Sequence, residues 1–203
     1  MEKEVEKNKG KVLMHACCAP CSVSCIEILE EKGYEFDLFW FNPNIHPYKE
    51  YEKRLETLKE YTASLNLNLH IKDEYSLEDF VKKQLINLED RCARVCYNLR
   101  LSEAAKFASE NGFSMYTTTL LVSPYQNREK IIEIGNYYGE KYGVEFIAPN
   151  FSERFWEGQR KAREIGMYMQ KYCGCIFSEA ERYKKNTWNF KNISLKKNKS
   201  KQV

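Results

Sequence analysis

The sequence contains little glycine and proline, and it has no long apolar segment. Of 203 residues, 9 are glycine and 5 are proline, which excludes a collagen-like or low-complexity chain and argues against long flexible linkers. The apolar runs fall well short of the roughly 20 residues that a membrane helix needs. The first residues, MEKEVEKNKGK, lack the apolar core of a signal peptide. We therefore expect a globular cytoplasmic protein that is not bound to a membrane.

The length and the charge distribution predict one domain followed by a basic tail. A chain of 203 residues with 43% hydrophobic residues can close a single core, which we place at residues 1–181. Residues 182–203 contain eight basic and no acidic residues, whereas the first 181 contain 24 basic and 29 acidic ones. Such a tail is typical of contact with nucleic acid, and equally of a solvated C-terminus.

Strand-like and helix-like segments alternate along the chain. Strands are predicted at 11–16, 35–41, 67–71, 114–121 and 144–147. Helices are predicted at 21–32, 48–65, from 77, and at 96–111, 124–142, 151–172 and 177–185. This alternation indicates a Rossmann-like (HUP-like) α/β domain, with a parallel sheet covered on both faces and a helical C-terminal part. Ligands of such sheets bind beyond the carboxyl ends of the strands, so residues 17–18 and 117–124 are expected to face one crevice.

Cysteine is the unusual residue of this sequence. In the cytoplasm thiols stay reduced, so clustered cysteines are expected to be metal ligands or catalysts rather than structural disulfides. Seven of the eight fall into three distant clusters: Cys17, Cys18 and Cys21; Cys92 and Cys96; Cys173 and Cys175. The first cluster opens a predicted helix, where backbone N–H groups and the helix dipole favour thiolates. The eighth, Cys25, is interpreted as a small core residue.

Cys92 and Cys96 form a second candidate pair of ligands. They are four residues apart near a helix start, so their side chains can converge on one site. Two such pairs, with Cys17 and Cys18, supply four thiolates, which suit either tetrahedral zinc or an iron–sulfur cluster. Spacing alone does not separate these two metals. The ferredoxin run that ends in Cys-Pro is absent, which disfavours a ferredoxin-like electron carrier.

The Cys173-Gly174-Cys175 sequence is a different kind of motif. A disulfide across a single residue would be strained, and strained disulfides are the labile, catalytic ones. The motif therefore favours a redox-active dithiol, with two further metal ligands as the alternative. Five polar or aromatic side chains near the loops are candidates for substrate contact, although packing explains each equally well: Tyr51, Arg54, Arg100, Tyr125 and Gln126.

Five motifs in order resemble the cobalamin-independent epoxyqueuosine reductase family, QueH. They are HACCAPCS at 15–22, NPNIHPYKEYEKR at 42–54, RCARVCYNLRL at 91–101, TTTLLVSPYQ at 117–126 and YMQKYCGCIFS at 168–178. The resemblance covers nearly the whole chain, from about residue 15 to 179. It implies reduction of the epoxide of epoxyqueuosine to the cyclopentene of queuosine, at the wobble position of tRNA.

The same resemblance implies cofactors, site residues and partners. It implies a 4Fe-4S cluster held by Cys17, Cys18, Cys92 and Cys96, with Cys173 and Cys175 as the redox pair. A further iron ion, held by Cys21 and an acid such as Asp90, is an additional expectation. The expected partners are the anticodon loop of tRNA and an electron donor that the sequence does not identify. Candidate cations for the RNA phosphates are Arg128, Arg160, Lys161 and Arg163.

Two functions from other classes compete with this one. A zinc-stabilised tRNA-binding module would use the same basic tail but would give Cys173 and Cys175 no role. A tRNA-thiolating or nucleotide-activating enzyme on a similar fold would need a Gly/Ser-rich phosphate loop after the first strand. Here that position holds Cys-Cys-Ala-Pro-Cys, with Pro20 where a backbone N–H donor would be required, which disfavours ATP binding.

Overall fold

A sheet of parallel strands forms the centre of the molecule. The computed structural model describes residues 10–86 and 90–184. Within these residues the sheet has five strands in the order β3-β2-β1-β4-β5, all parallel. Their bounds are β1 (Lys11–His15), β2 (Glu35–Trp40), β3 (Leu69–Ile71), β4 (Met115–Thr118) and β5 (Glu145–Phe146). The winding reverses between β1 and β4, so the carboxyl ends of these two strands open a crevice.

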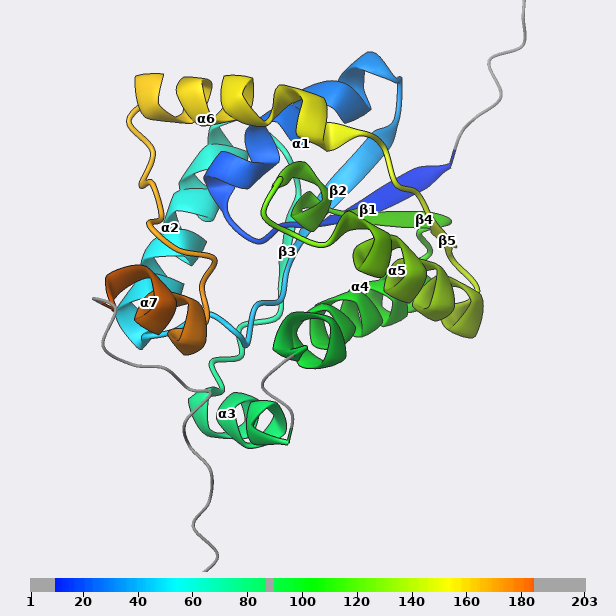
Figure 1. Cartoon of the computed structure of the whole chain (residues 1–203). Coiled ribbons are helices and arrows are strands. Elements are labelled where there is room, and N and C mark those ends of the chain that lie inside the picture. The colour runs from blue at the N-terminus through cyan, green and yellow to red at the C-terminus, as the bar shows by residue number, and fades with distance from the viewer. Residues whose placement is uncertain (1–9, 87–89, 185–203) are drawn as a thin grey trace, which may run out of the picture.

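Helices cover both faces of this sheet. Helices α1 and α6 lie together on one face, and α4 and α5 pack together on the other (Figure 1). The longer helices are α1 (Ala19–Glu31), α2 (Tyr48–Ser64), α3 (Leu77–Leu85), α4 (Asn98–Glu110), α5 (Arg128–Tyr142), α6 (Phe155–Glu164) and α7 (Ile176–Tyr183). A π-helix, η1 (Cys92–Tyr97), and two 3-10 turns, η2 (Thr119–Val122) and η3 (Phe151–Arg154), complete the described elements. The Rossmann-like prediction is confirmed.

Strand β1 is buried because it has neighbours and helices on every side. Val12, Leu13 and Met14 are fully buried, and Met14 lies opposite Leu38 of β2 and Thr117 of β4. This burial explains why the strand is a continuous apolar run rather than an alternating one. None of the helices among the described residues is long and apolar enough to span a membrane. Of the predicted basic tail, only residues 182–184 belong to the described part of the chain.

The predicted helix at 151–172 is wrong in its second half. Helix α6 ends at Glu164, and Gly166 follows with a φ of 74°, a left-handed conformation that favours glycine. Its N–H donates to the carbonyl of Arg163, and Met167 N–H donates to Ala162 O, which is a common helix-ending pattern. Residues 165–175 are therefore a non-helical segment, here called the crossing segment, that runs from α6 to α7 (orange in Figure 1).

Two other predicted boundaries differ from the structure. Helix α5 begins at Arg128 rather than at residue 124, because the Asn127 side chain accepts a hydrogen bond from Lys130 N at 3.0 Å. The strand predicted at 114–121 ends at Thr118 and continues as the turn η2. Its Thr118 hydroxyl accepts a hydrogen bond from Leu120 N at 3.2 Å, which ends the extended conformation.

A buried ion pair on α2 fixes the crossing segment. Arg54 is 2% exposed, and its Nε donates to Glu50 at 2.7 Å. Its two terminal nitrogens donate to the backbone carbonyls of Tyr172 and Cys173, both at 2.9 Å. The Tyr168 hydroxyl also donates to Glu50, so one carboxylate and one guanidinium hold both ends of this stretch. Arg54 was a candidate for substrate contact; the structure instead uses its nitrogens inside the fold.

The first prediction concerns this ion pair. Arg54→Met keeps the length of the side chain but removes the guanidinium that donates to the Glu50 carboxylate and to two backbone carbonyls. We expect a loss of about 3 kcal/mol in the free energy of unfolding, as for other broken buried pairs, and faster amide hydrogen exchange at residues 168–175. Urea denaturation and exchange mass spectrometry measure both effects. Lys53→Met is the matched control, because Lys53 is exposed; equal effects of the two changes would contradict the assignment.

The second prediction concerns His46, which is fully buried beside the rings of Tyr75 and Phe80. Burial lowers its pKa from 6.5 to about 4. Between these values the unfolded chain takes up a proton while the folded protein does not, so stability falls as the pH decreases through this window. Between pH 7 and pH 5, we expect the free energy of unfolding of His46→Gln to fall by about 1–2 kcal/mol less than that of the unchanged protein. Urea denaturation at both pH values measures the difference, and equal losses would contradict it.

Candidate metal and redox site

The site lies where β1 and β4 end side by side. Cys17 and Cys18 form the turn between β1 and α1, and Thr119 directly follows β4. Cys17 N–H donates to the Thr119 hydroxyl at 3.0 Å, and this hydroxyl donates to Cys17 Sγ at 3.2 Å. One side chain thus joins the two loops at the point where the winding reverses. The predicted crevice between residues 17–18 and 117–124 is confirmed.

His15 supports this junction from below. Its Nε2 lies 3.2 Å from the carbonyl of Phe41, and its Nδ1 lies 2.9 Å from the Thr118 hydroxyl. The carbonyl can only accept, so Nε2 carries the proton and Nδ1 accepts from the hydroxyl. Burial, followed by the charge of Arg100, lowers the pKa of His15 to about 4. A neutral His15 therefore holds the ends of both strands in place.

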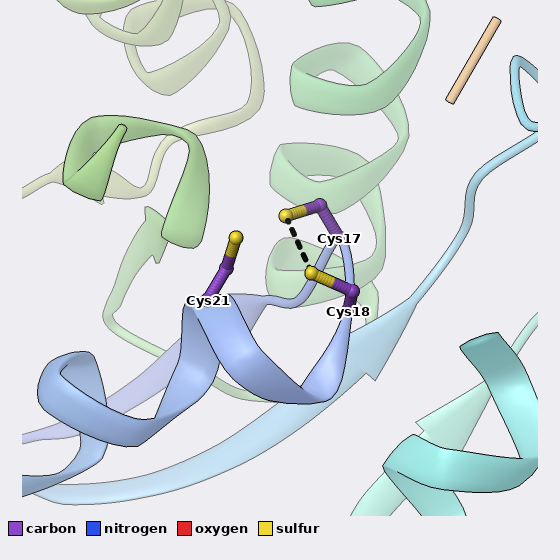
Figure 2. A group of neighbouring side chains, drawn as sticks. All are labelled: Cys17, Cys18 and Cys21. Carbon is purple, nitrogen blue, oxygen red and sulfur yellow. Dashed lines mark hydrogen bonds between the residues drawn. The ribbon is translucent and has the colours of Figure 1, made fainter. Parts of the chain in front are cut away.

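Three thiols converge at the start of α1. The Sγ atoms of Cys17, Cys18 and Cys21 all lie within 4.8 Å of one another, with Cys17 and Cys18 3.7 Å apart. Figure 2 shows the first two on the turn and Cys21 on the first turn of the helix, with the sulfurs pointing toward one another. Cys25 lies one turn further and donates to the Cys21 carbonyl at 3.2 Å, which agrees with its predicted core role. We call these three thiols the cysteine trio.

The trio is electrostatically suited to a cation. Hydrogen bonds from Cys18 and Cys21 hold the pKa of Cys17 well below its usual value, although burial acts against this. Burial raises the pKa of the Cys18 thiol, and the hydrogen bond to Cys17 raises that of Cys21. Cys17 is thus the first thiolate, and a bound metal cation would favour loss of the other two protons. Soft thiolates of this kind suit zinc or iron–sulfur clusters.

Gln170 of the crossing segment completes the surroundings of the trio. Its Nε2 lies 2.8 Å from Cys18 Sγ and 3.6 Å from Cys21 Sγ. The sequence pattern does not single out Gln170, because residue 170 falls within a predicted helix. Only its position in the matched motif YMQKYCGCIFS pointed to it. Thr119 was missed for a similar reason, since it was assigned to a strand.

Cys92 and Cys96 belong to the π-helix η1, and a buried arginine contacts Cys96. Arg100 is 1% exposed, donates from Nη2 to Cys96 Sγ at 3.0 Å, and donates from Nε to the Cys96 carbonyl at 3.1 Å. Burial raises the pKa of both thiols, and the charge of Arg100 opposes this. The same charge acts on Cys17 and on Cys173. Arg100 therefore links the thiols of η1 with the other two clusters.

The third cluster lies at the end of the crossing segment. Both thiols are free; Cys173 is exposed, whereas Cys175 is buried and caps α7 by accepting from Ser178 N at 3.4 Å. Gln126 donates to Cys173 Sγ at 3.4 Å and accepts from the Tyr97 hydroxyl at 2.8 Å. Gly174 has a φ of 141°, and a Cβ there would lie 3.2 Å from Nη1 of Arg54. The turn between the two thiols thus requires glycine.

A cavity of about 820 Å³ lies beside the first and third cysteine clusters. It is lined by Cys17, Cys21 and Cys173 together with four of the five predicted substrate residues: Arg54, Arg100, Tyr125 and Gln126. The fifth, Tyr51, is 2% exposed, accepts from Trp40 Nε1 at 3.1 Å and donates to Asp73 at 2.7 Å. It supports the core instead. The cavity also contacts side chains that the sequence did not indicate, notably Phe155, Trp156, Gln159 and Lys171.

Asp90, the predicted partner of Cys21, lies elsewhere. It lines a separate hollow with Arg94, Lys130 and Tyr137. Among the described residues, the group of potential ligands around Cys21 contains only the cysteine trio. The structure therefore does not bring Asp90 to Cys21.

Comparison with known proteins identifies the family of this chain. The family model described as epoxyqueuosine reductase QueH matches residues 12–181. The QueH protein of Thermotoga maritima is 40% identical over 187 residues, which cover 87% of this chain and 94% of that protein. The QueH protein of Dehalococcoides mccartyi is 30% identical over 175 residues, covering 86% of this chain and 96% of that protein.

A solved structure shows the same fold at much lower sequence identity. The U34-tRNA thiolase NcsA of Methanococcus maripaludis, solved with its [4Fe-4S] cluster, superposes with a TM-score of 0.52 and 14% identity. The match covers 87% of this chain and 64% of NcsA. At this identity the likeness supports the fold only, whereas the family match rests on sequence. The chain therefore belongs to the QueH family of epoxyqueuosine reductases, a family of oxidoreductases.

Proposed function

We propose that this protein reduces the epoxide of epoxyqueuosine in tRNA to the cyclopentene of queuosine. The observation that carries the proposal is that thiols of two distant cysteine clusters line one cavity, beside an arginine that contacts the third cluster. Cys17 and Cys21 line this cavity together with Cys173, and Arg100 links them electrostatically to Cys96. A purely structural metal site would not require an exposed dithiol beside it.

The residues present fit a thiolate-bound metal cofactor. We propose Cys17, Cys18, Cys92 and Cys96 as the ligands of a 4Fe-4S cluster, since four thiolates are the usual set. NcsA, which shares the fold, carries such a cluster. When bound, the cluster supplies electrons singly from an external donor. The additional iron is not part of this proposal, because Asp90 lies apart from Cys21.

The overall reaction requires two electrons and two protons. Both C–O bonds of the epoxide break, a C=C bond forms, and the oxygen leaves as water. Oxidation of the Cys173 and Cys175 thiols to a disulfide releases two electrons and two protons, so this pair balances one turnover. The external donor then returns the pair to its dithiol form. The exposed Cys173 faces the cavity, as a thiol that reacts with a substrate must.

Other residues of the cavity can stabilise the negative charge that develops on the epoxide oxygen and can hold the reacting thiol in place. Arg100 lines the cavity, and its fixed charge favours an oxyanion. Gln126 holds Cys173 through a hydrogen bond and is itself held by Tyr97, so the thiol is kept in place before the substrate binds. The neutral His15 lies under Cys17 and fixes the turn rather than transferring protons.

The RNA substrate is expected to approach the open side of this cavity. Unpaired bases of an anticodon loop can be splayed out and inserted into a protein pocket. Arg163, one of the four predicted phosphate contacts, lines the cavity. Arg128 donates to the carbonyls of Ala148 and Pro149, and both Arg160 and Lys161 pair with glutamates, so these three have roles within the fold. The contribution of the basic tail and the cytoplasmic location stay predictions.

The third prediction tests the cofactor. Anaerobic reconstitution with iron and sulfide should give a brown, oxygen-sensitive protein with about four irons per chain, which reduces epoxyqueuosine in tRNA when a low-potential reductant is present. Cys17→Ala and Cys96→Ala should lose the visible absorption and the iron. Cys25→Ala, in the same helix as Cys21, is the control and should retain both the absorption and the iron. A colourless zinc protein that is fully folded in air would refute this part of the proposal.

The fourth prediction tests the dithiol. Cys173→Ser and Cys175→Ser should bind iron normally but show no turnover, because neither variant can release two electrons by forming the disulfide. Iron analysis and nucleoside chromatography of the digested tRNA measure the two properties. If Cys173→Ser turned over like the unchanged protein, the dithiol would have no redox role and a metal-stabilised RNA-binding module would become the better description.

A further inference from the structure

Two large aromatic side chains stand exposed at the mouth of the cavity. Tyr125, before α5, is 77% exposed, and Trp156, in the first turn of α6, is 66% exposed. Both line the cavity that contains Cys17 and Cys173. Large aromatic side chains are mostly buried in folded proteins, and exposed ones beside a functional cavity are typical of a binding surface. Their occupant must offer flat, apolar faces.

Phe155 connects these two side chains. Its ring lies edge-on to Tyr125 at 6.2 Å and to Trp156 at 4.8 Å between centroids. We call Tyr125, Phe155 and Trp156 the aromatic rim. Because Phe155 is half-buried and contacts both neighbours, the rim is partly ordered before any ligand binds. Such ordering reduces the entropy lost when a ring stacks on it.

The charges around the rim suit a polyanion. Arg163, Lys171 and Arg182 line the same cavity, against a single acidic residue, Glu181. Glu181 pairs with Arg91 at 2.5 Å, so its charge is largely compensated. Exposed aromatic rings next to uncompensated cations are the usual arrangement of proteins that bind single-stranded nucleic acid.

We propose that the aromatic rim stacks on an unpaired base adjacent to the modified nucleotide, while Arg163 and Lys171 contact the flanking phosphates. The proposal rests on the proposed function and specifies how its substrate is held. The modified nucleotide enters the cavity toward Cys173, and its neighbour remains outside on Trp156. The rim therefore separates the nucleotide that reacts from the rest of the loop.

An acidic redox protein is the competing occupant of this surface, since an electron donor must also reach the thiols. The mouth of the cavity favours RNA, because the modified nucleotide has to pass through it while attached to its strand. A protein that covered Tyr125 and Trp156 would close this entrance. The two occupants also differ in the side chain that they require at position 156, because stacking on a base requires an aromatic ring there.

The test measures binding without any chemistry. Fluorescence anisotropy with a labelled, unmodified anticodon stem–loop RNA gives the dissociation constant of the reconstituted protein. We expect Trp156→Ala to weaken binding about tenfold, in line with the loss of one stacked base, and Trp156→Phe to weaken it much less. The slope of log Kd against log salt should be unchanged by Trp156→Ala and reduced by Lys171→Ala, because the lysine is proposed to contact a phosphate and the tryptophan is not. Tyr137→Ala is the matched control: Tyr137 is an exposed aromatic residue of α5 that lines a separate hollow.

The outcomes separate this inference from the proposed function. One outcome is that the unchanged protein reduces epoxyqueuosine in tRNA, while Trp156→Ala binds RNA as tightly as the unchanged protein. In that case the inference is wrong and the proposed function stands. If Trp156→Ala binds RNA normally but accepts electrons slowly from a protein donor, the rim belongs to the donor and the inference is also wrong. If the unchanged protein binds the stem–loop through Trp156 but never reduces the epoxide, the proposed function fails while the stacking contact stands.

Discussion

The site depends on the hydrogen bonds between Cys17 and Thr119. At the point where the winding reverses, the loops that follow two neighbouring parallel strands lead away from each other. The hydrogen bonds of the sheet do not connect these two loops. Here the Thr119 hydroxyl accepts from the backbone of Cys17 and donates to its sulfur, at 3.0 and 3.2 Å. Below it, the neutral His15 bridges to Thr118 and to Phe41. The position of the first thiol, and hence of the whole trio, is set by these contacts with β4.

The crossing segment brings the remaining chemistry to this junction. It contributes Gln170 to the trio and places Cys173 at the cavity, yet it has no regular structure of its own. Its conformation is imposed by Arg54, whose guanidinium donates to two of its carbonyls from inside the core. A charged residue is costly to bury, and it is tolerated here because Glu50 and the carbonyls satisfy its donors. The cysteine trio and the dithiol are thus held by separate elements, α1 and α2, that meet through one loop.

The fold could be read from the sequence because its signals are local. The apolar run of β1 and the alternation of strands with helices require no knowledge of distant contacts.

The cysteine clusters were also visible in the sequence, but their arrangement in space was not. The sequence grouped Cys21 with Cys17 and Cys18, and the structure places the three sulfurs within 4.8 Å of one another, whereas Asp90, the other expected ligand of a further iron, lines a separate hollow. The end of α6 at Glu164 depends on the left-handed Gly166, and the role of Arg54 depends on carbonyls more than a hundred residues away. Long-range contacts of this kind leave no periodic pattern.

This chain shares its fold with a tRNA thiolase, so the residues of the turn after β1, and not the fold itself, determine which chemistry is available. Enzymes that activate a nucleotide at this turn need free backbone N–H groups to bind phosphate. Here the turn and the helix start present Cys17, Cys18 and Cys21, and Pro20 removes one donor. The same helix N-terminus that would favour a phosphate favours a thiolate instead, because both are anions. Thiols in place of a phosphate loop thus make this position suited to a metal, with the sheet unchanged. In the proposed function, the thiols of the crossing segment are the feature that separates a reductase from a protein that only binds a metal.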